Sequence, residues 1–155
     1  MKTSGKIEDL NVTGIKVDIV KNILNENGFP AEIESKVDYS LIKSLSGETT
    51  YKILLSHMNE KGDGFLNLSF VADYGFSSNL LTSIQLINKY NLAHRFTKGY
   101  VNDVGIIKIR TDWFVNYYVS QKQVLTWIQL WNASLILFEA FWFQAKENKT
   151  PDRIF

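Results

Sequence analysis

Residues 120–146 read SQKQVLTWIQLWNASLILFEAFWFQAK, and this stretch decides the architecture. Ser120 and Gln123 form the S-x-x-Q pattern of a helix capping box, and Pro151 follows the apolar stretch. We therefore predict a helix over residues 121–146. Winding it at about 100° per residue gives one continuous apolar stripe, which we expect to pack on the core. The stripe consists of Val124, Ile128, Trp131, Leu135, Phe138 and Trp142.

The opposite side of this predicted helix changes character along its length. It begins polar, with Lys122, Thr126 and Gln129, and then becomes apolar. A helix that buries one face has no need of a second apolar face, and such a face marks a contact site when it is exposed. We therefore expect a protein-contact face, either a homodimer seam or a groove for another protein. Its residues are Leu130, Ala133, Ile136, Leu137, Ala140 and Phe143.

Two other interpretations of this second apolar side stay open. Strands or the N-terminal arm could cover it, which would make it part of the core. Alternatively, the helix could cross a membrane, but the polar residues Gln129, Asn132, Ser134 and Glu139 interrupt the apolar span and argue against this. We expect no membrane span.

The rest of the chain predicts an α+β fold. Leu66, Leu68, Phe70 and Ala72 alternate with polar residues, as in a half-buried antiparallel strand. Residues 31–35 and 39–45 have the weakest strand patterns. The expected architecture is a twisted antiparallel sheet flanked by helices, in the order α-β-β-β-α-β-β-α. Helices are predicted over 14–27, from a cap at Ser77 or Ser78, and over 121–146; strand patterns cover 31–35, 39–45, 50–58, 65–72, 96–102 and 106–111.

The first two helices have their own start and stop signals. Thr13 is a candidate N-cap for the first helix, and Gly28 followed by Pro30 predicts its end. The second helix is expected to turn one apolar side inward. That side consists of Leu80, Leu81, Ile84 and Ile87.

Length and composition restrict the class of protein. A chain of 155 residues fits one domain, which we place at 13–146 between a flexible arm (1–12) and a tail (147–155). The net charge of +1 argues against a nucleic-acid binder. There is no cysteine, so disulfides and thiolate chemistry are excluded. The first residues contain no apolar run, and we expect a cytoplasmic protein.

The sequence contains no motif of a known catalytic site. Neither a phosphate-binding loop nor a G-x-S-x-G or H-E-x-x-H pattern is present. The two histidines, His57 and His94, lie in separate predicted elements, and only a structure can show whether they converge. An unrecognised hydrolase stays an alternative, but we expect no enzyme, no metal and no cofactor.

One basic cluster stands out around the predicted hairpin turn at residues 103–105. If that turn closes the hairpin, Lys98 and Arg110 face each other across the strands, with Tyr100 and Lys108 beside them. The cluster is either a solvated sheet face or a surface for an anion or an acidic partner. Its candidate residues are Arg95, Lys98, Tyr100, Lys108 and Arg110.

Several motifs, in this order and spacing, resemble the YbjN family of bacterial proteins over residues 17–143. A helix ends in an Asn-x-Tyr-Asn pattern, an Arg-Phe pair follows, and a tyrosine-bearing strand leads into an Asp-x-Gly turn. The last helix has a matching start and a W-x-x-x-L-x-x-F pattern. Where many members have Gly-Gly before that helix, this chain has 116–118, Asn-Tyr-Tyr. The matching residues are Asn88, Tyr90, Asn91, Arg95, Phe96, Tyr100, Asp103, Gly105, Ser120, Leu125, Trp131, Leu135 and Phe138.

The resemblance implies a fold similar to type III secretion chaperones, often dimeric, and a role in bacterial sensory transduction without an established catalytic mechanism. We therefore expect a non-catalytic regulatory or chaperone-like domain that binds a protein or its own copy. The alternative is a small-ligand or anion sensor that uses the basic hairpin face. The resemblance gives no catalytic residues, and we expect Asn88, Asn91 and Phe96 to have structural roles.

Overall fold

The computed structural model describes residues 14–36, 38–115 and 119–147. The α+β class is confirmed, but the chain forms four strands before the second helix where the expected order has three. The additional strand arises because the two weakest strand patterns both form strands. The elements are α1 (Val17–Glu26), β1 (Ala31–Ser35), β2 (Ser40–Ser46), β3 (Thr49–Met58), β4 (Phe65–Phe76), α2 (Leu80–Ala93), β5 (Lys98–Val101), β6 (Ile106–Phe114) and α3 (Gln121–Glu147).

The six strands form one antiparallel sheet in the order β1-β2-β3-β4-β6-β5. Short turns join β1 to β4 as a meander, and α2 connects β4 to the β5–β6 hairpin. As a result β6, the last strand, lies between β4 and β5. The predicted turn at residues 103–105 closes that hairpin, in which the amide of Asn102 donates to the carbonyl of Ile106 at 3.0 Å.

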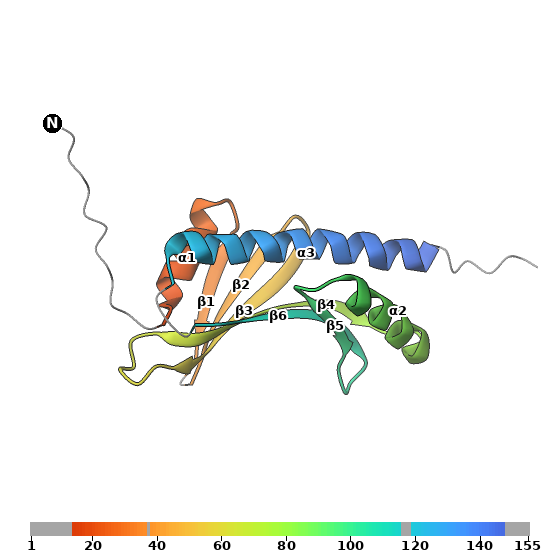
Figure 1. The fold of residues 1–155 in the computed structure, drawn as a ribbon, viewed down its shortest axis with the longest axis horizontal. Helices are drawn as coiled ribbons and strands as arrows, with labels where there is room; N and C mark the ends of the chain where they lie inside the picture. The colour runs from red at the N-terminus through yellow and green to blue at the C-terminus, as the bar shows by residue number, and fades with distance from the viewer. Residues whose placement is uncertain (1–13, 37, 116–118, 148–155) are drawn as a thin grey trace, which may run out of the picture.

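The three helices all lie on one side of the sheet. Figure 1 shows α3 crossing over that face, with α1 beside the N-terminal part of α3 and α2 beneath its C-terminal part. The stripe predicted for α3 is buried throughout, and Trp131 packs against Tyr51 and Phe70 with ring centroids 5.8 and 5.6 Å apart. Among the residues that the structure describes, no helix lies on the other face of the sheet.

α1 is shorter than predicted. It begins at Val17 after Lys16, whose side chain makes no capping bond; the expected cap at Thr13 lies outside the described residues. The stop signal is confirmed, since Gly28 adopts φ 82°, which favours glycine, and the amide of Phe29 bonds to the carbonyl of Leu24 at 2.9 Å. The expected N-terminal arm and residues 116–118 also lie outside the described residues.

The prediction for α2 is wrong about which side of the helix is buried. Asn79, not Ser77 or Ser78, caps the helix, and its side chain accepts from the amide of Thr82 at 3.0 Å. The buried residues are Ser83, Ile87 and Tyr90. Ile87 packs where Gly99 has no side chain, and Ser83 on the same side accepts a hydrogen bond from Ser77 at 2.8 Å, so the larger residues on the next side remain outside. Of the four residues predicted inside, Ile87 is buried, and Leu80, Leu81 and Ile84 are exposed.

β4 is buried on both faces over residues 67–70, whereas the alternation predicts a half-buried strand. Asn67 and Ser69, on the face away from α3, are as inaccessible as the apolar residues between them. Neighbouring strands supply their partners: the amide of Asn67 donates to the hydroxyl of Ser56 at 3.2 Å, and Ser69 contacts side chains of β6. Polar residues inside a central strand can therefore be buried when the adjacent strands hydrogen-bond them.

Candidate functional site

The contact face expected on α3 is uncovered among the described residues. Ile136, Leu137 and Phe143 are 66%, 52% and 56% exposed, Ala133 and Ala140 are also exposed, and Leu130 is half-buried. None of the described strands or helices packs over this side of the helix (Figure 1). The interpretation in which strands cover the face is thus excluded for the part of the chain that the structure describes.

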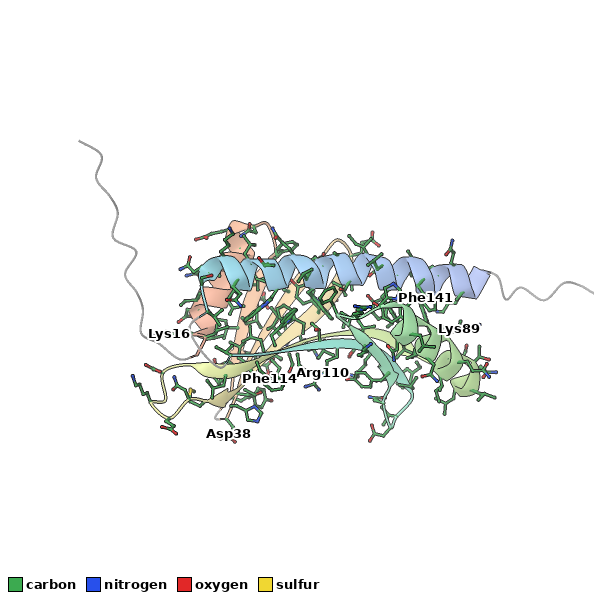
Figure 2. The ribbon with its side chains drawn as sticks, viewed as in Figure 1. Lys16, Asp38, Lys89, Arg110, Phe114 and Phe141 are labelled. Atoms are coloured by element: carbon green, nitrogen blue, oxygen red, sulfur yellow. The ribbon has the colours of Figure 1, made fainter. Side chains whose placement is uncertain are left out.

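Contacts on both flanks of α3 hold its orientation about the helix axis. On one flank, Glu139 accepts hydrogen bonds from Thr49, at the start of β3, and from the hydroxyl of Tyr74 in β4, the latter at 3.2 Å. On the other flank, the Phe141 ring lies 5.5 Å from Tyr90 of α2 (Figure 2). Because the two flanks are held, the orientation of the exposed apolar side is fixed.

By length and composition alone, one helix among the described residues, α3 over Gln121–Lys146, is long and apolar enough to cross a membrane. The core helix of a soluble protein passes the same test when it is mostly buried. Here one side of α3 packs on the sheet through Trp131, Leu135 and Phe138. Hydropathy is therefore weak support for a membrane role.

The basic hairpin has the predicted register. Lys98 pairs with Arg110 and Tyr100 with Lys108, on the sheet face that lies away from α3. Figure 2 shows Arg110 and Phe114 projecting from that face. The two strands therefore bring four of the five candidate anion-binding residues together; Arg95 lies before them, in the turn after α2.

Most of these basic side chains already have partners inside the chain. Lys108 forms an ion pair with Asp73 of β4 at 2.9 Å. The ammonium of Lys98 donates to the carbonyls of Asn91 and His94, at 3.1 and 2.9 Å, and so caps the end of α2. The positive charge that the sequence places on this hairpin is therefore largely neutralised or used for structure.

Arg110 is the most strongly engaged of them. Its guanidinium donates to both carboxylate oxygens of Asp112, at 2.8 and 2.9 Å, and to the hydroxyl of Ser69 at 3.1 Å. Ser69 also hydrogen-bonds Asp112. The hydrogen bonds to Asp112 raise the pKa of Arg110, and this closed triad occupies the donors that an anion would need.

The two histidines do not form a catalytic arrangement with each other. His57 is exposed near the end of β3 and contacts Ser56, whereas His94 stacks on Tyr90 with centroids 4.1 Å apart. A shallow groove of about 200 Å³ lies between the start of α2 and the end of α3, and neither histidine lines it. Among the described residues, no three His, Asp or Glu side chains could hold a metal ion.

Comparison with known proteins identifies the family of the chain. The family model described as "YbjN: Putative bacterial sensory transduction regulator" matches residues 16–148. The chain belongs to the YbjN family. No curated protein matches the sequence.

Two solved structures share the YbjN fold with this chain. One is YbjN from E. coli, described as "a putative transcription regulator", with a TM-score of 0.57, 12% identity and coverage of 83% of this chain and 93% of the other. The second is an uncharacterized protein from Methanothermobacter thermautotrophicus, with a TM-score of 0.59, 10% identity and coverage of 84% and 96%. At such low identity these similarities show the fold alone.

The YbjN signature residues have different surroundings in the structure. Asn91 bonds the backbone of Gly99 through both its donor and its acceptor, at 3.0 and 2.7 Å. Asn88 is exposed. Phe96 is also exposed, but its carbonyl accepts from the hydroxyl of Thr111 at 2.7 Å, which ties the turn after α2 to β6.

An apolar cluster that sequence spacing did not predict as a surface lies at the start of α2. The last residue of β4 and the β5–β6 turn lie beside it, because the amide of Ser77 bonds the carbonyl of Gly105 at 2.9 Å. The sequence pattern that could have indicated this cluster is the pair of adjacent apolar residues directly after the Asn79 cap. The exposed side chains are Phe76, Leu80, Leu81, Ile84 and Val104.

Proposed function

We propose that this YbjN-family protein is a non-catalytic, chaperone-like regulatory domain that binds protein through the exposed side of α3. The observation that carries the proposal is the row of large apolar side chains Ile136, Leu137 and Phe143, which stay more than half exposed on a helix held rigidly from both flanks. Exposed apolar patches on a well-packed domain are typical of protein-contact surfaces.

We propose a second copy of the chain as the partner. Between Lys122 and Lys146 the only charged residue of α3 is Glu139, which is turned toward Thr49 and Tyr74 of the sheet. The exposed side is therefore free of charge over this length, so two copies can meet without like-charge repulsion.

The spacing of the exposed residues supports a helix–helix contact. Ala133, Ile136, Leu137 and Ala140 follow the i, i+3, i+4, i+7 pattern of a helix-packing seam, and Phe143 continues it. The two alanines lie one heptad apart, and small residues at such positions let two helix backbones approach closely. The seam is thus shaped for another helix.

Light scattering at high micromolar concentration tests the proposal. We expect a dimer for the wild type and a monomer for the Ile136→Asp and Phe143→Asp variants, with unchanged circular dichroism. Gln129→Asp is the matched control, because it adds the same charge to the polar half of the same helix and should leave the dimer intact. A monomeric wild type whose solubility is unaffected by the two aspartates would contradict the proposal.

Anion sensing through the basic hairpin is the weaker candidate. Lys98, Lys108 and Arg110 each have a partner within the chain, and Arg95 is left as the exposed cation beside them. A thermal-shift screen with anionic metabolites tests it, with the Arg95→Ala/Lys98→Ala double variant as the control. An anion that stabilises the wild type and not the double variant would support anion sensing as the function.

A further inference from the structure

β5 covers only part of β6. Its four residues pair with residues 107–110, whereas β6 continues to Phe114 and remains paired with β4 up to that residue. In Figure 1 the short β5 lies beside only the hairpin end of β6. β6 is therefore an edge strand over residues 112–114, and we call Asp112, Trp113 and Phe114 the open edge.

Asn91 reveals which backbone groups bond across the β5–β6 pair. Its side chain takes both the amide and the carbonyl of Gly99 on the outer side of β5, so these groups do not point to β6. Because backbone groups alternate along an antiparallel strand, the neighbours Lys98 and Tyr100 are the residues that bond to β6.

The same alternation gives the direction of the groups on the open edge. Lys98 and Tyr100 lie opposite Arg110 and Lys108, so the even-numbered residues of β6 direct their amides and carbonyls toward the β5 side. Asp112 and Phe114 belong to that series. In agreement, the next odd-numbered residue, Val115, donates in the opposite direction, to the carbonyl of Leu66 at 2.8 Å.

No strand pairs with these outward groups in the part of the chain that the structure describes. The chain before β5 turns away after Thr97, and its last tie to β6 is the bond from the hydroxyl of Thr111 to the carbonyl of Phe96. Two amides and two carbonyls, those of Asp112 and Phe114, are therefore left facing the side where β5 would continue.

The other edges of the sheet are protected, as edge strands commonly are. β1 carries Glu32 and Glu34, and its first amide, that of Ala31, donates to the side chain of Asn25 at 3.1 Å. On β5, Asn91 occupies the outer backbone groups of Gly99. Among the described residues, no side chain bonds the outer groups of the open edge, and the edge carries no series of like charges, because Asp112 is paired with Arg110.

Aromatic side chains flank the open edge on both faces of the sheet. Phe114 projects from the face away from α3 and is 71% exposed (Figure 2). Trp113 is half-buried on the opposite face, stacked on Trp127 of α3 at 5.2 Å. Phe96, 62% exposed, lies at the end where β5 begins. An added strand could thus place apolar side chains against aromatic rings above and below.

We propose that the open edge binds an extended segment of a partner protein as an added antiparallel strand. Such a strand would run in the direction of β5, so its C-terminal end would meet the turn that carries the exposed Arg95 and Phe96. This charge favours an acidic residue or a terminal carboxylate at that end, after alternating apolar residues. The proposal is independent of the contact face on α3.

Paired synthetic peptides test the backbone contacts without changing the protein. The probe is the peptide acetyl-TVTVTVE, titrated into isotope-labelled protein while amide exchange is followed by NMR. We expect slower exchange at Asp112 and Phe114. Two versions of the peptide, methylated on alternate amides in the two possible phases, should bind differently. The version that loses the donors facing β6 should bind at least about tenfold more weakly, and the other version should bind as the unmodified peptide does.

A proline substitution tests the same contacts from the protein side. Phe114→Pro removes an outward amide that makes no bond within the sheet, so an edge position should tolerate it. Phe114→Ala is the matched control, because it also loses the ring but keeps the amide. We expect the alanine variant to retain binding and the proline variant to lose at least about tenfold in affinity, with folding checked by circular dichroism.

Three results would overturn the proposal. The first is peptide protection that appears elsewhere on the protein, or no saturable change at Asp112 and Phe114. The second is equal weakening by both methylation phases, which would show that backbone pairing is not involved. The third is protection of these two amides that depends on protein concentration without any peptide, because the occupant would then be a second copy.

Discussion

The side chain of Asn91 acts on Gly99 as a neighbouring strand would. Its amide nitrogen donates to the carbonyl of Gly99 at 3.0 Å, and its oxygen accepts from the amide of Gly99 at 2.7 Å. Asn91 thereby joins α2 to the outer edge of β5 and occupies the backbone groups of Gly99 that another strand would need. This gives a physical reason for the asparagine in the family motif.

Replacing Asn91 with alanine should destabilise the fold, because two half-buried backbone groups of Gly99 lose their partner. We expect the free energy of unfolding to fall by about 1–3 kcal/mol. Asn88→Ala is the control from the same helix, and its exposed position predicts a change within about 0.5 kcal/mol. Urea denaturation measures both, and equal effects of the two substitutions would refute a special role for Asn91.

Gly99 is required for its small size. A Cβ atom there would lie 3.1 Å from Cγ2 of Ile87, and the ring of Phe138 is close behind, at 3.7 Å. Gly99→Ala should therefore cost about 1–3 kcal/mol of unfolding free energy through overpacking. In the Ile87→Ala background the added methyl should cost less, since the clashing Cγ2 is gone; strictly additive effects in this double-mutant cycle would disprove the clash.

Periodicity predicted α3 and the β5–β6 hairpin well, because both depend on local spacing. The apolar stripe of α3 holds every buried residue predicted for it, and the turn at 103–105 sets the pairing of Lys98 with Arg110. The phase of α2 could not be obtained in this way. Its buried side is decided by the close packing of Ile87 against Gly99, which apolar spacing does not report.

For the candidate sites too, sequence spacing predicts features that depend on neighbouring residues and misses those that depend on residues far apart in the chain. Sequence spacing identified the apolar side of α3, but its exposure depends on what the rest of the chain covers. The basic cluster was also found, yet its partner Asp73 lies on β4, 35 positions before Lys108, and no local pattern links them. The open edge was missed because it results from the different lengths of β5 and β6.

Two buried tyrosines, Tyr51 and Tyr90, and the partly buried Tyr74 should make the protein sensitive to alkaline pH. Burial raises the pKa of Tyr51, Tyr74 and Tyr90, and Glu139 raises that of Tyr74 further. A raised pKa means that the unfolded chain loses the proton first. The tyrosines therefore contribute full stability below the unfolded value of about 10, and this contribution is lost as the pH rises above it.

Urea denaturation from about pH 8 to about pH 10.5 measures this loss, with tyrosinate absorbance recorded in parallel. Tyr74→Phe should reduce the slope of stability against pH above about pH 10, because one raised pKa is removed. Tyr39→Phe, which removes the same hydroxyl at an exposed position, is the matched substitution for comparison. Titration of all tyrosines at the unfolded value before unfolding would contradict the burial argument.

Removing Asp112 should create the anion site that the sequence offered as an alternative to a solvated sheet face. In the wild type, Asp112 occupies the guanidinium of Arg110 through both carboxylate oxygens, but Asp112→Ala leaves Arg110 facing Lys98 across the strands without an acid between them. Sulfate should then raise the melting temperature of this variant more than that of the wild type, because the anion replaces the lost carboxylate.

Chloride at equal ionic strength corrects for screening, and Asp103→Ala, at the exposed hairpin turn, controls for the loss of a negative charge. If sulfate stabilises all three proteins equally, then Asp112 is not what closes this site.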